Sequence, residues 1–282
     1  MESATQVLTT GYKDKVLEAN NLPAMPDAVH EITRLMSENN CSTDKVAAII
    51  EREQALAAKV LKMVNSPIYG FPGRITNVSN ALVLLGINVI RGLIISTSVF
   101  DPLNKHMSGL WKHSVACSLA SVEVAKAAGL EHPEDYSVMG LLHDIGKVIF
   151  LMQIPEARQE MQKLIEKDDL SFREAEKKLL GFTHEKVNAW LCEHWNLPLG
   201  LKEAMSFHHS PMQAKFNPEA AAVVHLADFM ARLFECGSGG DENVPPLDPK
   251  ALKLLNINHK ILESILDRLL ILYSDSANLS VM

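Results

Sequence analysis

Apolar residues recur at every third or fourth position along almost the whole chain, which is the spacing of one face of an α-helix. Signals of β-structure are scarce, because apolar and polar residues seldom alternate and no Asn-Gly or Asp-Gly turn joins two apolar runs. The pattern therefore predicts an all-α fold. Helices are expected over residues 43–64, 110–128, 155–167, 172–180, 183–194, 199–209, 218–234 and 258–272.

Residues 81–100 form an apolar stretch long enough to span a membrane. Arg91 lies at its centre, however, with Asn88 one turn away. An arginine at the centre of a membrane helix costs roughly 2.5–3.5 kcal/mol. We therefore expect two helices buried in the core of a soluble protein, and no membrane partner.

Charge and cysteine content restrict the partners and the compartment. The net charge is −7, from 27 basic and 34 acidic side chains, which argues against a nucleic-acid partner because binding phosphates needs a cationic surplus. No basic stretch followed by an apolar run marks the N-terminus as a secretory signal. Four cysteines without a Cys-x-x-Cys pair are typical of free thiols in a reducing compartment. We expect a cytoplasmic protein.

Composition suggests boundaries along the chain. A stretch rich in Gly and Ser follows Cys236 and is interpreted as a flexible loop. The predicted organisation is an N-terminal extension (1–20), a main domain (21–236) with an N-terminal helical half (21–105) and a histidine-bearing half (106–236), and a flexible loop with a C-terminal helical segment (237–282).

Histidines and aspartates in the second half have the chemistry of a metal site. Neutral imidazole and carboxylate suit divalent Zn, Mn and Fe, and one carboxylate can bridge two ions. Two ions can clamp a phosphoryl oxygen and activate a hydroxide, while Lys147 could place a cation on the phosphate. The candidates are His113, His143, Asp144, His184, His208, His209 and Asp228.

Each candidate also has a purely structural interpretation. A lone helical histidine such as His113 is most often a core or surface residue, and Asp228 could be a helix cap or a surface acid. The doublet His208-His209 could arise by chance in a chain with 11 histidines. Cys117, four residues after His113, is interpreted as a small core residue.

In order along the chain, these residues resemble the ligands of the HD phosphohydrolase superfamily, with His143-Asp144 inside an HDIGK motif. The N-terminal half resembles the HDOD branch (HD-related output domain) of that superfamily in several motifs. These are Leu22–Pro26, Ile49–Leu56, Lys59–Pro67, Tyr69-Gly70, Arg74-Ile75, Ala81-Leu82 and Leu84–Gly86. The resemblance implies an all-helical HD-type bundle with an N-terminal helical subdomain, in a bacterial cytoplasmic protein.

The resemblance also implies how the ligands divide. His113, His143, Asp144 and Asp228 would hold one metal ion, and Asp144 would bridge to a second ion held by His184, His208 and His209. HDOD domains act as signalling output or interaction modules, and many have lost metal ligands that this chain keeps. The favoured function is therefore a signalling module with a divalent metal site. The alternative is a phosphohydrolase in which Asp144 and Lys147 take part in catalysis.

A comparison with the related HD-GYP phosphodiesterases restricts that alternative. Their motif HHExxDGxGYP begins with a histidine doublet, and residues 208–218 agree with it only in the two histidines and the final proline. This argues against a cyclic di-GMP substrate. Gly109 stands where some of these enzymes carry the glutamate for a third metal, so at most two ions (Fe, Mn or Zn) are expected. A signalling protein or a phosphorylated small molecule would be the partner.

Overall fold

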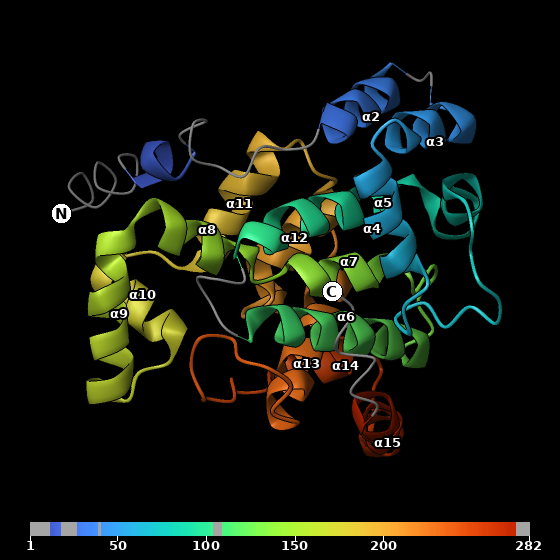
Figure 1. Ribbon diagram of the computed structural model, residues 1–282. Helices are drawn as coiled ribbons and strands as arrows, with labels where there is room; N and C mark the ends of the chain where they lie inside the picture. Colours follow the sequence, from blue (N-terminus) through green and yellow to red (C-terminus); the bar gives the residue numbers. More distant parts are fainter. Residues whose placement is uncertain (1–11, 18–26, 39–40, 104–108, 275–282) are drawn as a thin grey trace.

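The computed structural model describes residues 12–17, 27–38, 41–103 and 109–274 (Figure 1). These residues form helices and no strand, which confirms the all-α prediction. The helices are α2 (Asp27–Ser37), α3 (Thr43–Glu51), α4 (Gln54–Val64), α5 (Val78–Leu103), α6 (Leu110–Ala127), α7 (Asp135–Leu142), α8 (Ile145–Gln153), α9 (Pro155–Asp168), α10 (Phe172–Leu180), α11 (His184–His194), α12 (Leu199–Phe207), the 3₁₀ turn η1 (Pro211–Gln213), α13 (Pro218–Leu233), α14 (Pro249–Leu254) and α15 (His259–Ser274).

The single helix predicted over residues 43–64 is wrong, because the chain breaks there into α3 and α4. Arg52 ends α3, and Glu53 has the extended backbone of an N-cap before α4. The break lies in four consecutive exposed polar residues, 51–54, where no apolar side chain holds the helix against the core. The break allows α3 and α4 to pack separately on α5.

The apolar stretch of residues 81–100 lies in α5, which is kinked. Gly86 has φ 76° and ψ 165°, a conformation that divides α5 into two helical segments and that favours glycine. Among the described residues, α5 alone is long and apolar enough to cross a membrane, but 61% of its most apolar window is buried. Arg91 is also buried and donates from Nη1 to Thr33 Oγ1 at 3.3 Å. A mostly buried apolar helix of this kind is typical of a protein core.

Helix α6 runs through the middle of the second half (Figure 1). It packs against α7, α13 and α15, and buries residues around most of its circumference. The remaining helices of this half pack in sequence, α8 on α11, α11 on α12 and α12 on α13. Contacts of α5 with α7 join the two halves, and one hydrophobic cluster extends through both. The predicted boundary at 105/106 lies outside the described residues.

Candidate metal centre

Seven side chains from five segments meet in one buried cluster, and they are the seven predicted as ligands. Six of them are at most 1% exposed, and the side chain of His209 is 9% exposed. The cluster consists of His113 on α6, His143 and Asp144 between α7 and α8, His184 at the start of α11, His208 and His209 after α12, and Asp228 on α13.

The carboxylate of Asp144 lies at the centre of this cluster. Its Oδ2 atom is 3.4 Å from Nε2 of His143 and 3.7 Å from Nε2 of His113. Its Oδ1 atom is 3.3 Å from Nε2 of His184 and 3.7 Å from Nε2 of His208. The two oxygens therefore face two different pairs of imidazoles, which is the arrangement that a carboxylate bridging two cations requires.

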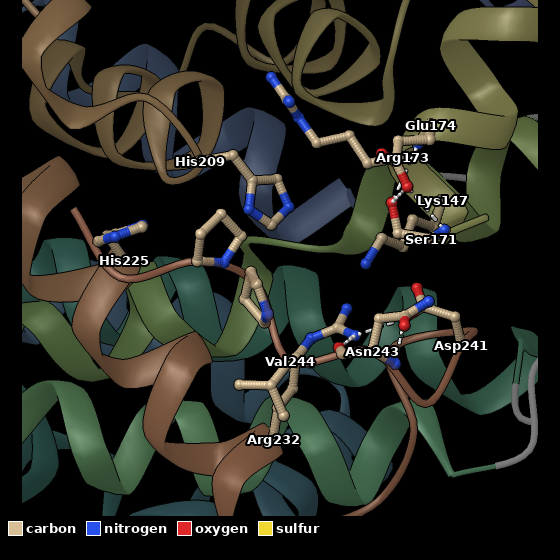
Figure 2. A pocket seen from close by; sticks show the side chains of 12 residues that line it. Lys147, Ser171, Arg173, Glu174, His209, His225, Arg232, Asp241, Asn243 and Val244 are labelled. Atoms are coloured by element: carbon tan, nitrogen blue, oxygen red, sulfur yellow. Dashed lines mark hydrogen bonds and ion pairs between the residues drawn. The ribbon is translucent and has the colours of Figure 1, made fainter. Parts of the chain in front are cut away.

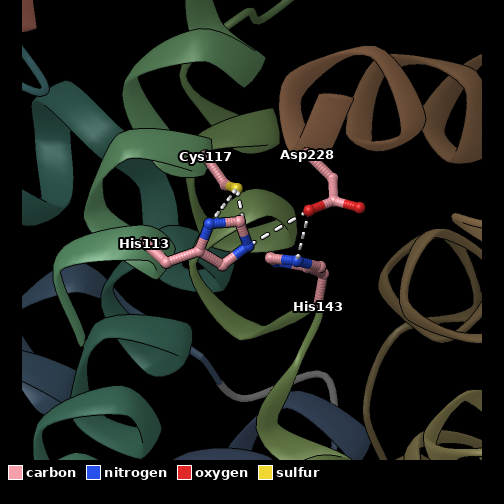
Figure 3. A group of neighbouring side chains, drawn as sticks. All are labelled: His113, Cys117, His143 and Asp228. Atoms are coloured by element: carbon pink, nitrogen blue, oxygen red, sulfur yellow. Dashed lines mark hydrogen bonds and ion pairs between the residues drawn. The ribbon is translucent and has the colours of Figure 1, made fainter. Parts of the chain in front are cut away.

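Asp228 lies beside the pair formed by His113 and His143 (Figure 3). Its Oδ1 atom is 3.1 Å from Nε2 of His113 and 3.8 Å from Nε2 of His143. Its Oδ2 atom is 3.9 Å from Nδ1 of His209. Cys117 is buried, as expected for a core residue, and its Sγ atom lies 3.5 Å from Nε2 of His113. Asp228 thus lies close to the His113–His143 pair through Oδ1 and close to His209 through Oδ2.

Contacts outside the cluster fix the orientation of three imidazole rings. Nδ1 of His143 donates to the Gly140 carbonyl at 2.7 Å, and Nδ1 of His208 donates to the Met205 carbonyl at 3.0 Å. Nδ1 of His184 lies 2.7 Å from Oε2 of Glu176, which also accepts the backbone N–H of His184. In a neutral ring whose Nδ1 carries the proton, Nε2 has a lone pair that points into the cluster.

Several inward-facing atoms lack a hydrogen-bond partner, and this fits a bound cation. Nε2 of His184 lies 3.2 Å from Nε2 of His208, so two imidazole nitrogens meet inside the cluster. Nε2 of His143 and Oδ1 of Asp144 are buried without any hydrogen-bond partner. Unpartnered buried polar atoms are costly. Divalent cations among these nitrogen and carboxylate donors would satisfy all four atoms, and the donor set suits Zn, Mn or Fe.

The local electrostatics keep Asp144 ionised and most of the imidazoles neutral. Burial opposes the charge of Asp144, but His143 and Lys147 outweigh it and hold the pKa of Asp144 well below its usual range. Burial lowers the pKa of His208 to about 4. His143 differs, because Asp144 and Asp228 outweigh its burial and raise its pKa to about 9. Burial lowers the pKa of the other three imidazoles, those of His113, His184 and His209.

These shifts predict that the metal-free protein is sensitive to acid. The pKa of His208 is about 4 in the folded protein and about 6.5 in an unfolded chain. The stability due to neutral His208 is therefore present above about pH 6.5 and is lost as the pH falls toward about 4. We expect the thermal midpoint in chelator to fall between about pH 7 and about pH 4.5, and to fall less in His208→Asn. Equal falls in both proteins would contradict this.

Glu176 is predicted to support the metal centre by orienting His184. Removing such an outer contact typically weakens metal binding 10–100-fold, so we expect about this loss for Glu176→Ala in competition with a chelator. Glu176→Gln keeps an acceptor for the ring and should retain most of the affinity. The exposed Glu160→Ala serves as a control. Equal affinity in Glu176→Ala and the wild type would show that this contact does not act on the site.

A pocket of about 310 Å³ opens beside the cluster, between α10, α13 and the loop after α13 (Figure 2). Its lining includes His209 and three cationic side chains, Lys147, Arg173 and Arg232. Nζ of Lys147 is 2.6 Å from Oδ2 of Asp144, and it donates to the Gly239 carbonyl at 3.0 Å. Lys147 therefore lies between the cluster and the pocket. Its predicted role in catalysis stays a prediction.

Three residues that contact the site were absent from the sequence-based candidates. Arg232 donates from Nε to Oδ1 of Asp228 at 3.1 Å, and its position four residues later on one helix could have indicated this pair. Glu176 and Asn188 reach the site from α10 and α11. No local pattern indicates their roles, because their partners are in other parts of the chain.

The sequence and the fold are both similar to those of known proteins. The profile of the HDOD domain matches residues 22–211. A protein of Treponema pallidum (strain Nichols), described as uncharacterised, is 24% identical over 214 residues, which are 74% of this chain and 41% of that protein. The chain thus spans less than half the length of this relative.

Solved structures of similar fold include an HDOD domain protein of unknown function from Geobacter sulfurreducens, with a TM-score of 0.73, 22% identity, and coverage of 97% of this chain and 98% of that chain. A candidate signal transduction protein from Marinobacter aquaeolei VT8 has a TM-score of 0.75 at 17% identity, covering 99% and 65%. A candidate phosphohydrolase from Shewanella amazonensis SB2B has a TM-score of 0.69 at 20% identity, covering 94% and 96%. These likenesses show the fold, and the profile match over most of the sequence shows that the chain belongs to the HDOD domain family.

Proposed function

We propose that this chain is an HDOD signalling module whose buried cluster holds a divalent transition metal, with room for up to two ions of Fe, Mn or Zn. The observation that carries the proposal is the set of imidazole and carboxylate donor atoms that face one another inside the buried cluster. Nε2 of His184 faces Nε2 of His208 at 3.2 Å, and Oδ1 of Asp144 has no partner. In a cluster that served only for packing, buried polar atoms would be expected to have hydrogen-bond partners, because burying them without partners is costly.

The distances support two groups of ligands with Asp144 between them. Donor atoms of His113, His143 and Asp228 lie within 4.8 Å of one another, and so do those of the second group, which consists of His184, His208 and His209. Asp144 directs one oxygen toward each group. A bridging carboxylate would keep two ions close together while one side chain serves both.

Signalling partners and a cytoplasmic location are part of the proposal. The similarity to a candidate signal transduction protein supports a signalling role. All four cysteines are free, which suits a reducing compartment. In this interpretation the metal centre sets the conformation of the module, and a partner protein responds to that conformation.

The pocket favours a second candidate function, a metal-dependent phosphohydrolase acting on a phosphorylated small molecule. Lys147, Arg173 and Arg232 line the pocket and could attract a phosphate, while His209 brings the metal cluster to its wall. Divalent ions held by the cluster would supply a hydroxide nucleophile and polarise a phosphoryl oxygen. Lys147 and Arg232 would hold the phosphate in position and balance its charge. The similarity to a candidate phosphohydrolase supports this possibility.

Elemental analysis tests the main proposal. Protein purified without chelators, or reconstituted with Mn²⁺, Fe²⁺ or Zn²⁺, is expected to contain about two metal ions per chain. A metal-free protein that takes up none of the three ions would refute the proposal. A screen of the loaded protein against phosphomonoesters and phosphodiesters then separates the two functions, because turnover that is lost in Lys147→Ala would support the hydrolase.

A further inference from the structure

The loop of residues 237–246, called the strap below, contacts the metal centre through two cationic side chains. Lys147 and Arg232 each touch one carboxylate of the cluster and one part of the strap. The strap lies beyond residues 22–211, the part of the chain that matches the family profile. The family profile therefore says nothing about the contacts that the strap makes with Lys147 and Arg232.

Lys147 makes the first connection. Its Nζ atom is 2.6 Å from Oδ2 of Asp144 and 3.0 Å from the carbonyl oxygen of Gly239 in the strap. The side chain is 1% exposed. A buried ammonium needs both partners, because a lost hydrogen bond cannot be replaced by water there.

Arg232 makes the second connection with a fork of hydrogen bonds. Nε donates to Oδ1 of Asp228 at 3.1 Å, while Nη1 donates to Oδ1 of Asp241 at 3.1 Å and to the Asn243 carbonyl at 2.9 Å. The side chains of Asp228 and Asp241 are 2% and 3% exposed. Asp241 also accepts the backbone N–H of Phe172 at 2.8 Å, so the strap is fixed to α10 as well.

The glycines of the strap allow it to lie directly against the centre. A Cβ atom on Gly239 would be 2.2 Å from Nη2 of Arg232, and one on Gly237 would be 2.4 Å from the backbone nitrogen of His113. The backbone N–H of Ser238 donates to the Gly109 carbonyl at 3.2 Å. The strap is thus packed against the helix that carries His113.

The charges of the centre determine how firmly the strap is held. Without metal, Lys147 and Arg232 neutralise the carboxylates of Asp144 and Asp228. Two divalent ions would bring four positive charges to the same carboxylates. The ammonium and the guanidinium would then face like charges at short range in a buried site, where water screens little. Both side chains would have to move away from the carboxylates and would weaken their contacts with the strap.

We propose that the strap is a metal-responsive output element: Lys147 and Arg232 hold it against the metal-free centre, and loading of the centre with divalent ions releases it. This inference rests on the proposed function, because it requires that the cluster binds metal. Release would move the pocket wall formed by Asn243, Val244 and Pro245 away from the metal centre. A signalling partner could then distinguish the loaded module from the empty one.

Hydrogen exchange of the full chain tests the strap, with Mn²⁺ or Zn²⁺ alone as the probe and KCl at equal ionic strength as the control. We expect the amides of residues 237–244 to exchange about tenfold faster in the loaded protein, while amides of α13 stay unchanged. Elemental analysis of the same samples separates the two proposals. If metal binds and exchange in the strap is unchanged, the strap inference is wrong and the proposed function stands. If no metal binds, both are wrong.

A pair of variants in the strap gives an independent test. Asp241→Asn removes a charged partner of Arg232, so its strap should exchange rapidly without metal and change little when metal is added. Glu242→Gln makes the same change in charge at an exposed neighbouring position and should behave like the wild type. A strap in Asp241→Asn that is as protected as the wild type without metal would overturn the inference.

Discussion

Asp144→Ala is expected to lower the metal content from about two ions per chain to almost none. Asp144 lies between the two imidazole pairs, with Oδ2 3.4 Å from Nε2 of His143 and Oδ1 3.3 Å from Nε2 of His184. Losing it removes a ligand from both ions and the negative charge that offsets them. Elemental analysis after reconstitution measures the effect. Retention of both ions would show that Asp144 does not bridge them.

The control for this experiment must separate metal loss from unfolding. Asp144→Ala leaves the ammonium of Lys147 buried without its carboxylate, and breaking a buried pair in this way costs about 3–5 kcal/mol. In the double variant Asp144→Ala, Lys147→Met neither charge remains, so much of that stability should return. The double variant is therefore expected to fold and still bind no metal. The exposed Asp168→Ala should keep its full metal content.

Much of the fold follows from local signals. The helix predicted over residues 172–180 coincides with α10, because Ser171 and Glu174 form a capping box at its start and Gly181 ends it in a left-handed conformation. The single helix predicted over residues 43–64 is wrong, and the spacing of apolar residues does not reveal the break between α3 and α4. Apolar positions on both sides of the break keep a helical spacing, and only the four exposed polar residues at 51–54 mark the break.

The candidate site could be predicted as a set of residues but not as a geometry. The order of the seven residues along the chain carried the resemblance, and the structure brings all seven together. Sequence spacing cannot show that Oδ1 and Oδ2 of Asp144 face different imidazole pairs. Nor can it show that the ammonium of Lys147, three residues after Asp144, also reaches the distant carbonyl of Gly239. The ligand roles themselves stay predictions until metal is measured.

Asn188 shows most clearly what sequence reasoning missed. Its side chain is fully buried on α11 and joins three segments that carry the site. Nδ2 donates to the carbonyls of His143 and Met205, and Oδ1 accepts the backbone N–H of Gly146. Gly146 also allows the close approach, because a Cβ atom there would lie 2.6 Å from Oδ1 of Asn188. An asparagine inside a helix gives no local sign of such a role.

Asn188→Ala is therefore expected to lower the free energy of unfolding by about 3–9 kcal/mol, measured by urea denaturation in chelator. The reason is that three buried backbone groups lose their partner, at about 1–3 kcal/mol for each. The same groups position His143 and, through Met205, His208, so metal affinity should fall as well. The exposed Asn80→Ala is the control and should change stability by less than about 0.5 kcal/mol. A loss below about 1 kcal/mol in Asn188→Ala would mean that water or a shift of α11 satisfies these groups, and that the asparagine does not hold the site together.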